Sequence, residues 1–198
     1  MVTWPYKNRS ISILWSFHLS SQSILADNIQ ALTSGAEILK RLSREQYNQV
    51  SSPYFTASVG KHFRHILDHY LSFISGLSDR HVNYDQRDRE ARIETDAHCA
   101  LDTLQQIIAT LSTLKTTANP RAITEQHLYV TLCTSCSTEL TEPVASSLQR
   151  ELVFLQGHTI HHYAIIAAIL KFEGVSVDQS FGVAASTQKY LKQMQCAR

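Results

Sequence analysis

Two histidines one helical turn apart lie near the end of the chain, in the stretch "GHTIHHYA" from Gly157 to Ala164. His158 and His162 fall within the apolar seam of a predicted helix, and an i, i+4 pair points two imidazoles at one spot, where both can bind a divalent metal. Without a shared ion, two adjacent buried imidazoles would cost desolvation and would repel each other when protonated. The pair is therefore predicted to ligate a metal, whereas His161 points roughly 100° away and is predicted to be a neighbour.

A third ligand must come from another helix, and the stretch "KHFRHILDHY" offers His62, His65 and His69. Periodicity places His62 and His69 at the edge of this segment's apolar face and His65 well off it, so periodicity favours His62 or His69. A single buried histidine is usually hydrogen-bonded to a carbonyl or a hydroxyl rather than bound to a metal. At least one of the three is therefore expected to be an ordinary histidine.

The polar segment after these histidines supplies candidates for a second shell or a substrate contact: Tyr84, Asp85, Arg87 and Glu94. A carboxylate can fix the tautomer of a ligating imidazole, and an arginine can hold an anionic substrate. The plainer alternative is a solvated, charged loop. Arg150 and Glu151, one to two turns before His158, are candidates of the same kind, and an exposed ion pair on a helix is the plainer alternative for them.

Two other motifs are not expected to carry chemistry. Thr159 follows His158 where a HExxH protease motif requires glutamate, so the general base of that motif is missing. Cys133 and Cys136 form a CxxC, but no strand-to-helix context and no second pair accompany them. This CxxC is interpreted as incidental.

Apolar residues that repeat at intervals of three and four predict the elements that position these side chains. Long helices are predicted at residues 22–42, 58–76, 96–114 and 143–172. Ser58 is the predicted cap of the second, Pro143 lies near the first turn of the last, and a final short helix is capped by Ser186. The stretches "HLYVTLCT" and "CSTELT" predict two short strands. The fold is therefore predicted to be all-α with a small β-hairpin insert before the last long helix.

Composition limits the class of protein further. The chain has 198 residues, 43% of them hydrophobic, which suits one domain, with residues 1–20 as an N-terminal extension and 21–198 as the domain. A formal net charge of +1 gives no basic stripe, so no nucleic-acid partner is expected. The apolar runs are shorter than a membrane span requires. Four unevenly spaced cysteines suggest a reducing, cytoplasmic location.

The blocks "SVGKHFRHILDHY", "VNYDQRDRE", "IETD", "GHTIHHYA" and "FGVA", read in this order, resemble the DinB/YfiT-like metalloprotein superfamily in its uncharacterised bacterial branch. The resemblance covers the chain from about Ile24 onward. It implies a four-helix bundle of down-up-up-down order, often a homodimer, with three histidines that bind zinc, nickel or iron. The implied ligands are His65, His158 and His162. For the second helix the resemblance is preferred over periodicity, because a ligand near a bundle's mouth need not follow the buried stripe, and His62 and His69 remain alternates.

In family members that are enzymes, the metal activates a thiol or a water, as in thiol S-transferases and some hydrolases. The resemblance therefore implies a metal-dependent enzyme with a thiol or another small molecule as substrate. Two alternatives remain from other classes: a metal-binding protein without catalysis, and a structural, dimerising bundle whose histidines bind no metal tightly. An open three-histidine site favours the metal-dependent enzyme over both alternatives, because three protein ligands leave one metal position for substrate.

Overall fold

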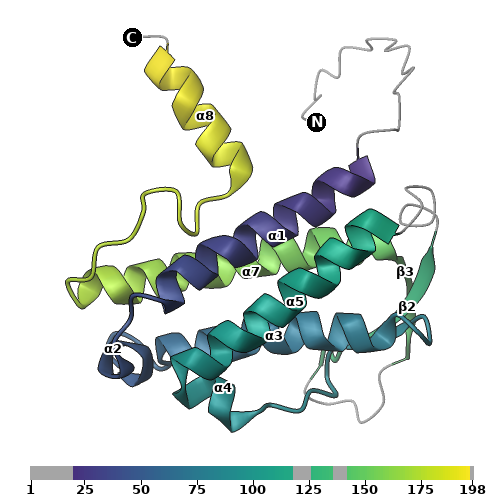
Figure 1. The fold of residues 1–198 in the computed structure, drawn as a ribbon, viewed down its shortest axis with the longest axis horizontal. Coiled ribbons are helices and arrows are strands. Elements are labelled where there is room, and N and C mark those ends of the chain that lie inside the picture. Colours follow the sequence, from purple (N-terminus) through teal and green to yellow (C-terminus); the bar gives the residue numbers. More distant parts are fainter. Residues whose placement is uncertain (1–19, 118–125, 136–141, 197–198) are drawn as a thin grey trace, which may run out of the picture.

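The computed structural model describes residues 20–117, 126–135 and 142–196. In these residues the chain forms seven α-helices and one small three-stranded sheet, which confirms the prediction of a mostly helical protein. Figure 1 shows the long helices lying together, with the sheet at one end of them and the last helix extending away. The predicted extension lies outside the described residues, apart from Ser20, which begins the first helix.

Four long helices make up most of the structure: α1 (Ser20–Leu39), α3 (Val59–Gly76), α5 (Ala97–Thr117) and α7 (Leu148–Phe172). Helix α1 packs against α5 and α7, and α3 packs against the same two helices (Figure 1). Their apolar stripes meet in one core, and burial of these side chains is the main source of stability. Fully buried members of that core are Leu32, Phe63, Leu67, Phe73, Leu104, Leu152, Leu155 and Ile166.

Side-chain caps set the beginnings of the two histidine-bearing helices. The Ser58 hydroxyl accepts a hydrogen bond from the Lys61 N–H at 3.1 Å, which confirms the predicted start of α3. Ser147 accepts from the Arg150 N–H at 3.2 Å and caps α7. The predicted start of the last long helix near Pro143 is therefore wrong, because the residues that follow it pair with a neighbouring strand.

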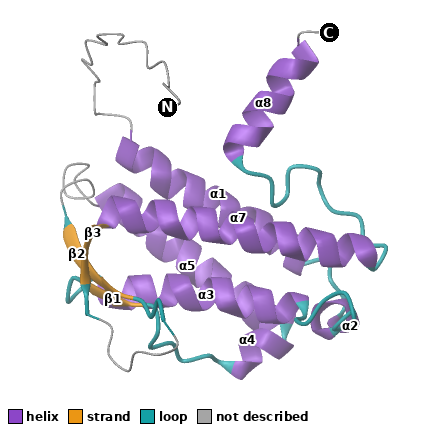
Figure 2. Ribbon diagram, turned by 180° about the vertical axis from the view of Figure 1, so that it is seen from behind, coloured by secondary structure: helices purple, strands orange, loops and turns teal. Residues whose placement is uncertain are grey.

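The sheet contains β1 (His81–Asn83), β2 (His127–Thr131) and β3 (Val144–Ser147), in that spatial order (Figure 2). Strands β2 and β3 are antiparallel, with Val130 opposite Val144, whereas β1 and β2 are parallel. The predicted antiparallel pair is thus present, but its second strand is β3. The stretch "CSTELT" lies outside the described residues. Strand β1 comes from a segment predicted to be a loop.

Three short helices complete the described chain: α2 (Arg44–Asn48), α4 (Ala91–Thr95) and α8 (Ala185–Cys196). Helix α4 packs directly against α3 at Gly60. A side chain at this position would clash with the Glu94 carbonyl oxygen, 2.0 Å from where its Cβ would lie, so only glycine allows this close approach. Helix α8 extends away from the other helices (Figure 2), and it begins at Ala185, so Ser186 lies inside it and is not its cap.

Among the described residues, α7 is the one helix whose length and composition would allow it to cross a membrane. Core helices of soluble proteins have the same property, and α7 packs against α1 and α3 along one side. That no segment of this chain spans a membrane stays a prediction.

A buried polar network joins α1, α3 and α7. The Tyr70 hydroxyl donates to Asn28 Oδ1 at 2.7 Å, and the Asn28 amide donates to the Leu152 carbonyl at 3.0 Å. The Thr159 hydroxyl shares its hydrogen between Tyr70 Oη at 3.2 Å and the Leu155 carbonyl at 2.8 Å. Because unpaired polar groups in a core are costly, this network restricts α3 and α7 to one register.

Two buried tyrosines predict opposite responses to the loss of a hydroxyl. Tyr163 is 1% exposed and its hydroxyl has no hydrogen-bond partner among the described residues, whereas Tyr70 is bonded on both sides. Tyr163→Phe should raise the free energy of unfolding by about 1 kcal/mol, and Tyr70→Phe should lower it by about 1 kcal/mol or more. Urea unfolding of both variants checks this, and a loss of stability in Tyr163→Phe would contradict it.

Candidate metal centre

Five imidazole rings from α3 and α7 form one continuous group, named here the histidine cluster: His62, His65, His69, His158 and His162. Within it, the His65 centroid lies 4.9 Å from that of His158 and 4.6 Å from that of His162. The His69 and His158 centroids are 4.3 Å apart, and those of His158 and His162 are 4.6 Å apart. The packing of α3 on α7 therefore brings together both sets of histidines in which ligands were predicted.

One close group of three ligand atoms, named here the close ligand group, belongs to His65, His69 and His158, whose nitrogens all lie within 4.8 Å of one another. A tetrahedral ion with nitrogens at about 2.0 to 2.1 Å holds them about 3.4 Å apart, so a metal would draw these rings slightly together. The ligand set implied by the resemblance shares His65 and His158 with this group. Its third ligand is His162, whereas the third member of this group is His69. His162 contacts the rings of His65 and His158 but does not belong to that close group.

His69 and His158 each have a free nitrogen with the chemistry that a metal requires. His69 Nδ1 lies 2.8 Å from the His65 backbone oxygen, which can only accept, so Nδ1 carries the hydrogen and the lone pair is on Nε2. His158 Nε2 is buried and has no hydrogen-bond partner among the described residues. A buried nitrogen without a partner is destabilising, and a bound cation would satisfy it. The residues present therefore fit a divalent metal.

All five histidines of the cluster are biased toward the neutral form. Burial lowers the pKa of His65 and of His162 to about 3, and the pKa of His69 and of His158 to about 4. Burial also lowers the pKa of His62. Positive charge on neighbouring imidazoles adds to the effect for His65, His158 and His162. At neutral pH the rings are uncharged, and each keeps one lone pair for a metal or a hydrogen bond.

At the outer end of the cluster, His62 Nδ1 lies 3.0 Å from His162 Nδ1. Two neutral imidazoles can make this contact only if one nitrogen carries a hydrogen and the other accepts it. One ring of the pair therefore donates its Nδ1 hydrogen to the Nδ1 lone pair of the other. His161 is exposed and contacts only the edge of the cluster, with its ring 5.1 Å from that of His162.

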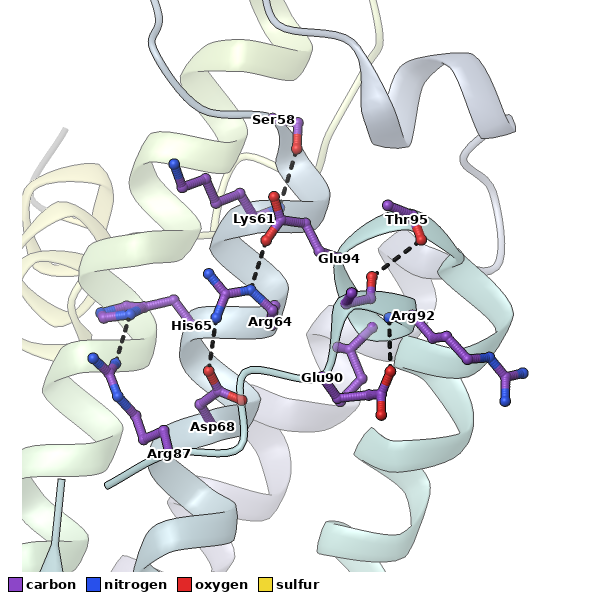
Figure 3. A network of polar contacts seen from close by, with 12 residues as sticks. Ser58, Lys61, Arg64, His65, Asp68, Arg87, Glu90, Arg92, Glu94 and Thr95 are labelled. Carbon is purple, nitrogen blue, oxygen red and sulfur yellow. Dashed lines mark hydrogen bonds and ion pairs between the residues drawn. The ribbon is translucent and has the colours of Figure 1, made fainter. Parts of the chain in front are cut away.

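Two of the four residues predicted around the site lie against the cluster. Arg87 Nη1 donates to His65 Nδ1 at 3.1 Å (Figure 3). The Tyr84 ring stacks on His69 at 5.3 Å, and its hydroxyl donates to Glu151 Oε2 at 2.9 Å. Each of the two therefore touches a histidine of the close ligand group directly.

The other two predicted residues act away from the histidines. Asp85 Oδ2 accepts from the Cys133 backbone N–H at 2.6 Å and so ties the loop after β1 to the end of β2. Glu94 accepts from Arg64 Nε at 2.6 Å, and Arg64 also pairs with Asp68 at 3.0 Å (Figure 3). In the described residues their contacts stabilise the segments that surround the cluster.

Phe154 is a site residue that sequence reasoning missed, whereas Glu151 was a candidate with an exposed ion pair as the plainer alternative. Glu151 does pair with Arg150 at 3.0 Å, but it is fully buried and also accepts from Tyr84 and Ser146, so the expected exposure is wrong. Phe154 stacks on His158 with centroids 5.5 Å apart. Glu151 lies seven residues before His158 and Phe154 lies four residues before it, so both are on the same face of the helix as His158. This spacing is the sequence signal that could have identified them.

Two cavities among the described residues lie away from the histidine cluster. One of about 490 Å³ lies between α1, α7 and the segment before α8, and Tyr163 and Phe181 line it. Another of about 510 Å³ lies beside β2 and β3 and ends at Arg150 and Glu151. The identification of the site therefore rests on donor chemistry and not on the volume of a cavity.

The CxxC motif is described only in part. Cys133 is exposed, and its thiol donates to the Ser135 carbonyl at 3.0 Å. Cys136 lies outside the described residues, so the interpretation of this motif as incidental stays a prediction.

Comparisons with known proteins find one relative and no family. The chain is 33% identical over 111 residues to a protein of Rhizopus delemar named FK506-binding protein 5. The match covers 56% of this chain and 28% of that protein, so the chain spans well under two thirds of the relative. No family model matches the chain, and no solved structure matches it.

The pKa values of the cluster predict how the metal-free protein responds to acid. Because folding lowers these pKa values from 6.5 to about 3 or 4, the unfolded chain binds protons first, and stability falls as the pH drops from about 6.5 toward 4. Replacement of one buried titrating ring, as in His65→Gln, should make that pH dependence shallower. Urea unfolding of chelator-treated protein between these pH values measures it.

The matched control is His127→Gln, which removes an exposed histidine at the start of β2, outside the cluster. It should leave the pH dependence of the wild type unchanged. An equal pH dependence in His65→Gln and the wild type would contradict the assigned pKa shifts.

Proposed function

We propose that this chain is a metal-dependent protein whose histidine cluster binds one divalent ion. The observation that carries the proposal is the buried, unpartnered Nε2 of His158 among neutral imidazoles that converge from two helices. A bound cation would satisfy a nitrogen that otherwise has no partner among the described residues, and a neutral imidazole is the form that binds a metal. Imidazole ligands suit zinc, nickel or iron.

The ion is proposed to lie between His65 and His158, which belong to both the close ligand group and the set implied by resemblance. His69 is the third ligand if the observed geometry is kept, and His162 if the cluster follows the family arrangement. His69 already has a tautomer suited to ligation through Nε2, whereas His162 Nδ1 is hydrogen-bonded to His62. Variants of these two residues therefore separate the alternatives.

We further propose that the chain is a four-helix bundle of the DinB/YfiT-like type, formed by α1, α3, α5 and α7. Support comes from the mutual packing of these helices and from the position of the histidines on the second and last of them. The small sheet is an insert in this scheme. The proposed homodimer follows from the same resemblance, and the proposed cytoplasmic location follows from the unevenly spaced cysteines.

The proposed activity is thiol S-transfer or hydrolysis on a small molecule. A divalent metal with three imidazole ligands keeps an open position and lowers the pKa of a thiol or a water bound there. Tyr84 stacks on His69 and is itself fixed by the buried Glu151, so this ring has one orientation. The hydrogen-bonded His62–His162 pair can relay a proton beside the site: one proton enters at Nε2 of the ring that donates through Nδ1, the shared hydrogen crosses, and the other ring releases its Nε2 hydrogen.

Other activities are less well supported. Thr159 is fully buried and its hydroxyl contacts only core groups, so nothing at this position replaces the glutamate of a HExxH protease. The Rhizopus delemar relative is named for FK506 binding, but the shared region is 28% of that protein, and we propose no FK506 site here. A metal-binding protein without catalysis remains the second candidate, because the same cluster would serve it.

Metal content provides the test of the site. Protein purified without an affinity tag or chelator should contain close to one divalent metal per chain, and His158→Gln should lose it, because this substitution removes a nitrogen common to both ligand sets. His69→Gln and His162→Gln should differ, with the greater loss in the variant of the third ligand. Elemental analysis measures this directly.

The control is His161→Gln, an exposed histidine next to the cluster that should keep its metal. Metal-free wild-type protein that also fails to bind added zinc or nickel would contradict the proposal. Metal-loaded protein that catalyses neither thiol transfer nor ester hydrolysis would favour the second candidate.

A further inference from the structure

Arg87 is a half-buried cation without a carboxylate partner. No ion pair joins it to any described residue, and its Nε is buried with no hydrogen-bond partner there. Its Nη1 donates to a neutral ring nitrogen of His65 at 3.1 Å. By contrast, the nearby Arg64 pairs with both Asp68 and Glu94 (Figure 3).

A desolvated guanidinium is normally stabilised by an anion, and bidentate pairing with a carboxylate is its preferred geometry. The Asp68 carboxylate gives its hydrogen bond to Arg64 and forms no ion pair with Arg87 among the described residues. The cost of desolvating Arg87 remains, and one further negative charge would offset it.

The hydrogen bond between Arg87 and His65 is incompatible with a metal on a neutral His65. Arg87 donates to Nδ1, so Nδ1 must hold the ring's one lone pair and Nε2 must carry the hydrogen. A metal at Nδ1 would displace Arg87 directly. A metal at Nε2 would move the ring hydrogen to Nδ1, which could then no longer accept from Arg87. In both cases Arg87 must leave His65 before the metal binds.

We propose that Arg87 binds the carboxylate of a small molecule at the histidine cluster. When Arg87 moves from His65 to this carboxylate, the His65 lone pair becomes available to the metal, so metal binding and carboxylate binding favour each other. This inference rests on the proposed metal site and adds the class of its substrate. One guanidinium with Asp68 close by matches a single negative charge better than the double charge of a phosphate. The substrate of the site is therefore a carboxylic acid.

The coupling has a measurable consequence in both directions, because a carboxylate that raises metal affinity must gain affinity from the metal by the same factor. Acetate is the probe, and acetamide is its neutral counterpart. In isothermal titration calorimetry of zinc into chelator-treated, full-length protein at matched ionic strength, acetate should raise zinc affinity about five-fold or more. Acetamide should leave it unchanged.

Substitution of Arg87 separates its two roles. Arg87→Gln should bind zinc at least as tightly as the wild type without acetate, because the competitor for the His65 lone pair is gone, and it should lose the acetate effect. Arg87→Lys keeps the positive charge but loses the paired N–H donors that bind a carboxylate through both oxygens, and it should retain part of the acetate effect. Arg89→Gln is the control, since it removes an exposed charge from the same loop and should respond to acetate like the wild type.

The outcomes distinguish this inference from the proposed function. One zinc per wild-type chain with no acetate effect, or weaker zinc binding by Arg87→Gln without acetate, would overturn the inference alone. A larger effect of inorganic phosphate than of acetate would overturn the choice of a carboxylate. No zinc binding by the wild type would overturn both the inference and the metal site on which it rests.

Discussion

The register of α3 against α7 is the constraint on which the candidate site depends. Tyr70 and Thr159 meet in the core at 3.2 Å, and Asn28 of α1 completes the network. Each of these two residues directly follows a histidine of the close ligand group, His69 on α3 and His158 on α7. The polar contact that fixes the helix register therefore also fixes which imidazoles face each other. A shift of one helical turn would break the network and separate the rings.

The cluster itself adds little to stability and imposes a cost. Burial makes protonation of its rings unfavourable, and one nitrogen of His158 is buried without a partner. Groups of this kind persist where the surrounding fold holds them in place, and they are typical of functional sites. Tyr84, Phe154 and the fully buried Glu151 form such a support around the rings. The site is thus prepared for a cation by the fold and not by the histidines alone.

The sequence predicted the parts of this arrangement that follow from helical periodicity. The i, i+4 spacing of His158 and His162 and the capped start of α3 were sufficient to place histidines from both helices together. Periodicity favoured His62 or His69, and the close ligand group contains His69 but not His62. The resemblance instead implied His162, and the structure shows this residue in ring contact with the others. The residue that completes the ligand set depends on side-chain rotation, which spacing along one helix does not determine.

Features that depend on contacts between distant segments were missed. Strand β1 is three residues long and is a strand only because β2 lies beside it, so its own composition resembles a loop. Helix α7 begins later than predicted because Val144–Ser147 pairs with β2 and is therefore unavailable to the helix. Glu151 looked like a surface residue, since its burial depends on Tyr84 and Ser146 from other elements. Local pattern carries none of this information.

X-ray absorption spectroscopy of the zinc-loaded protein tests the central claim most directly, because it identifies the atoms bound to the metal. The account predicts three imidazole nitrogens at about 2.0 to 2.1 Å and one further light ligand, with no sulfur. Sulfur at about 2.3 Å, or a shell made only of oxygen, would place the metal elsewhere on the chain and contradict the assignment of the histidine cluster as a metal site.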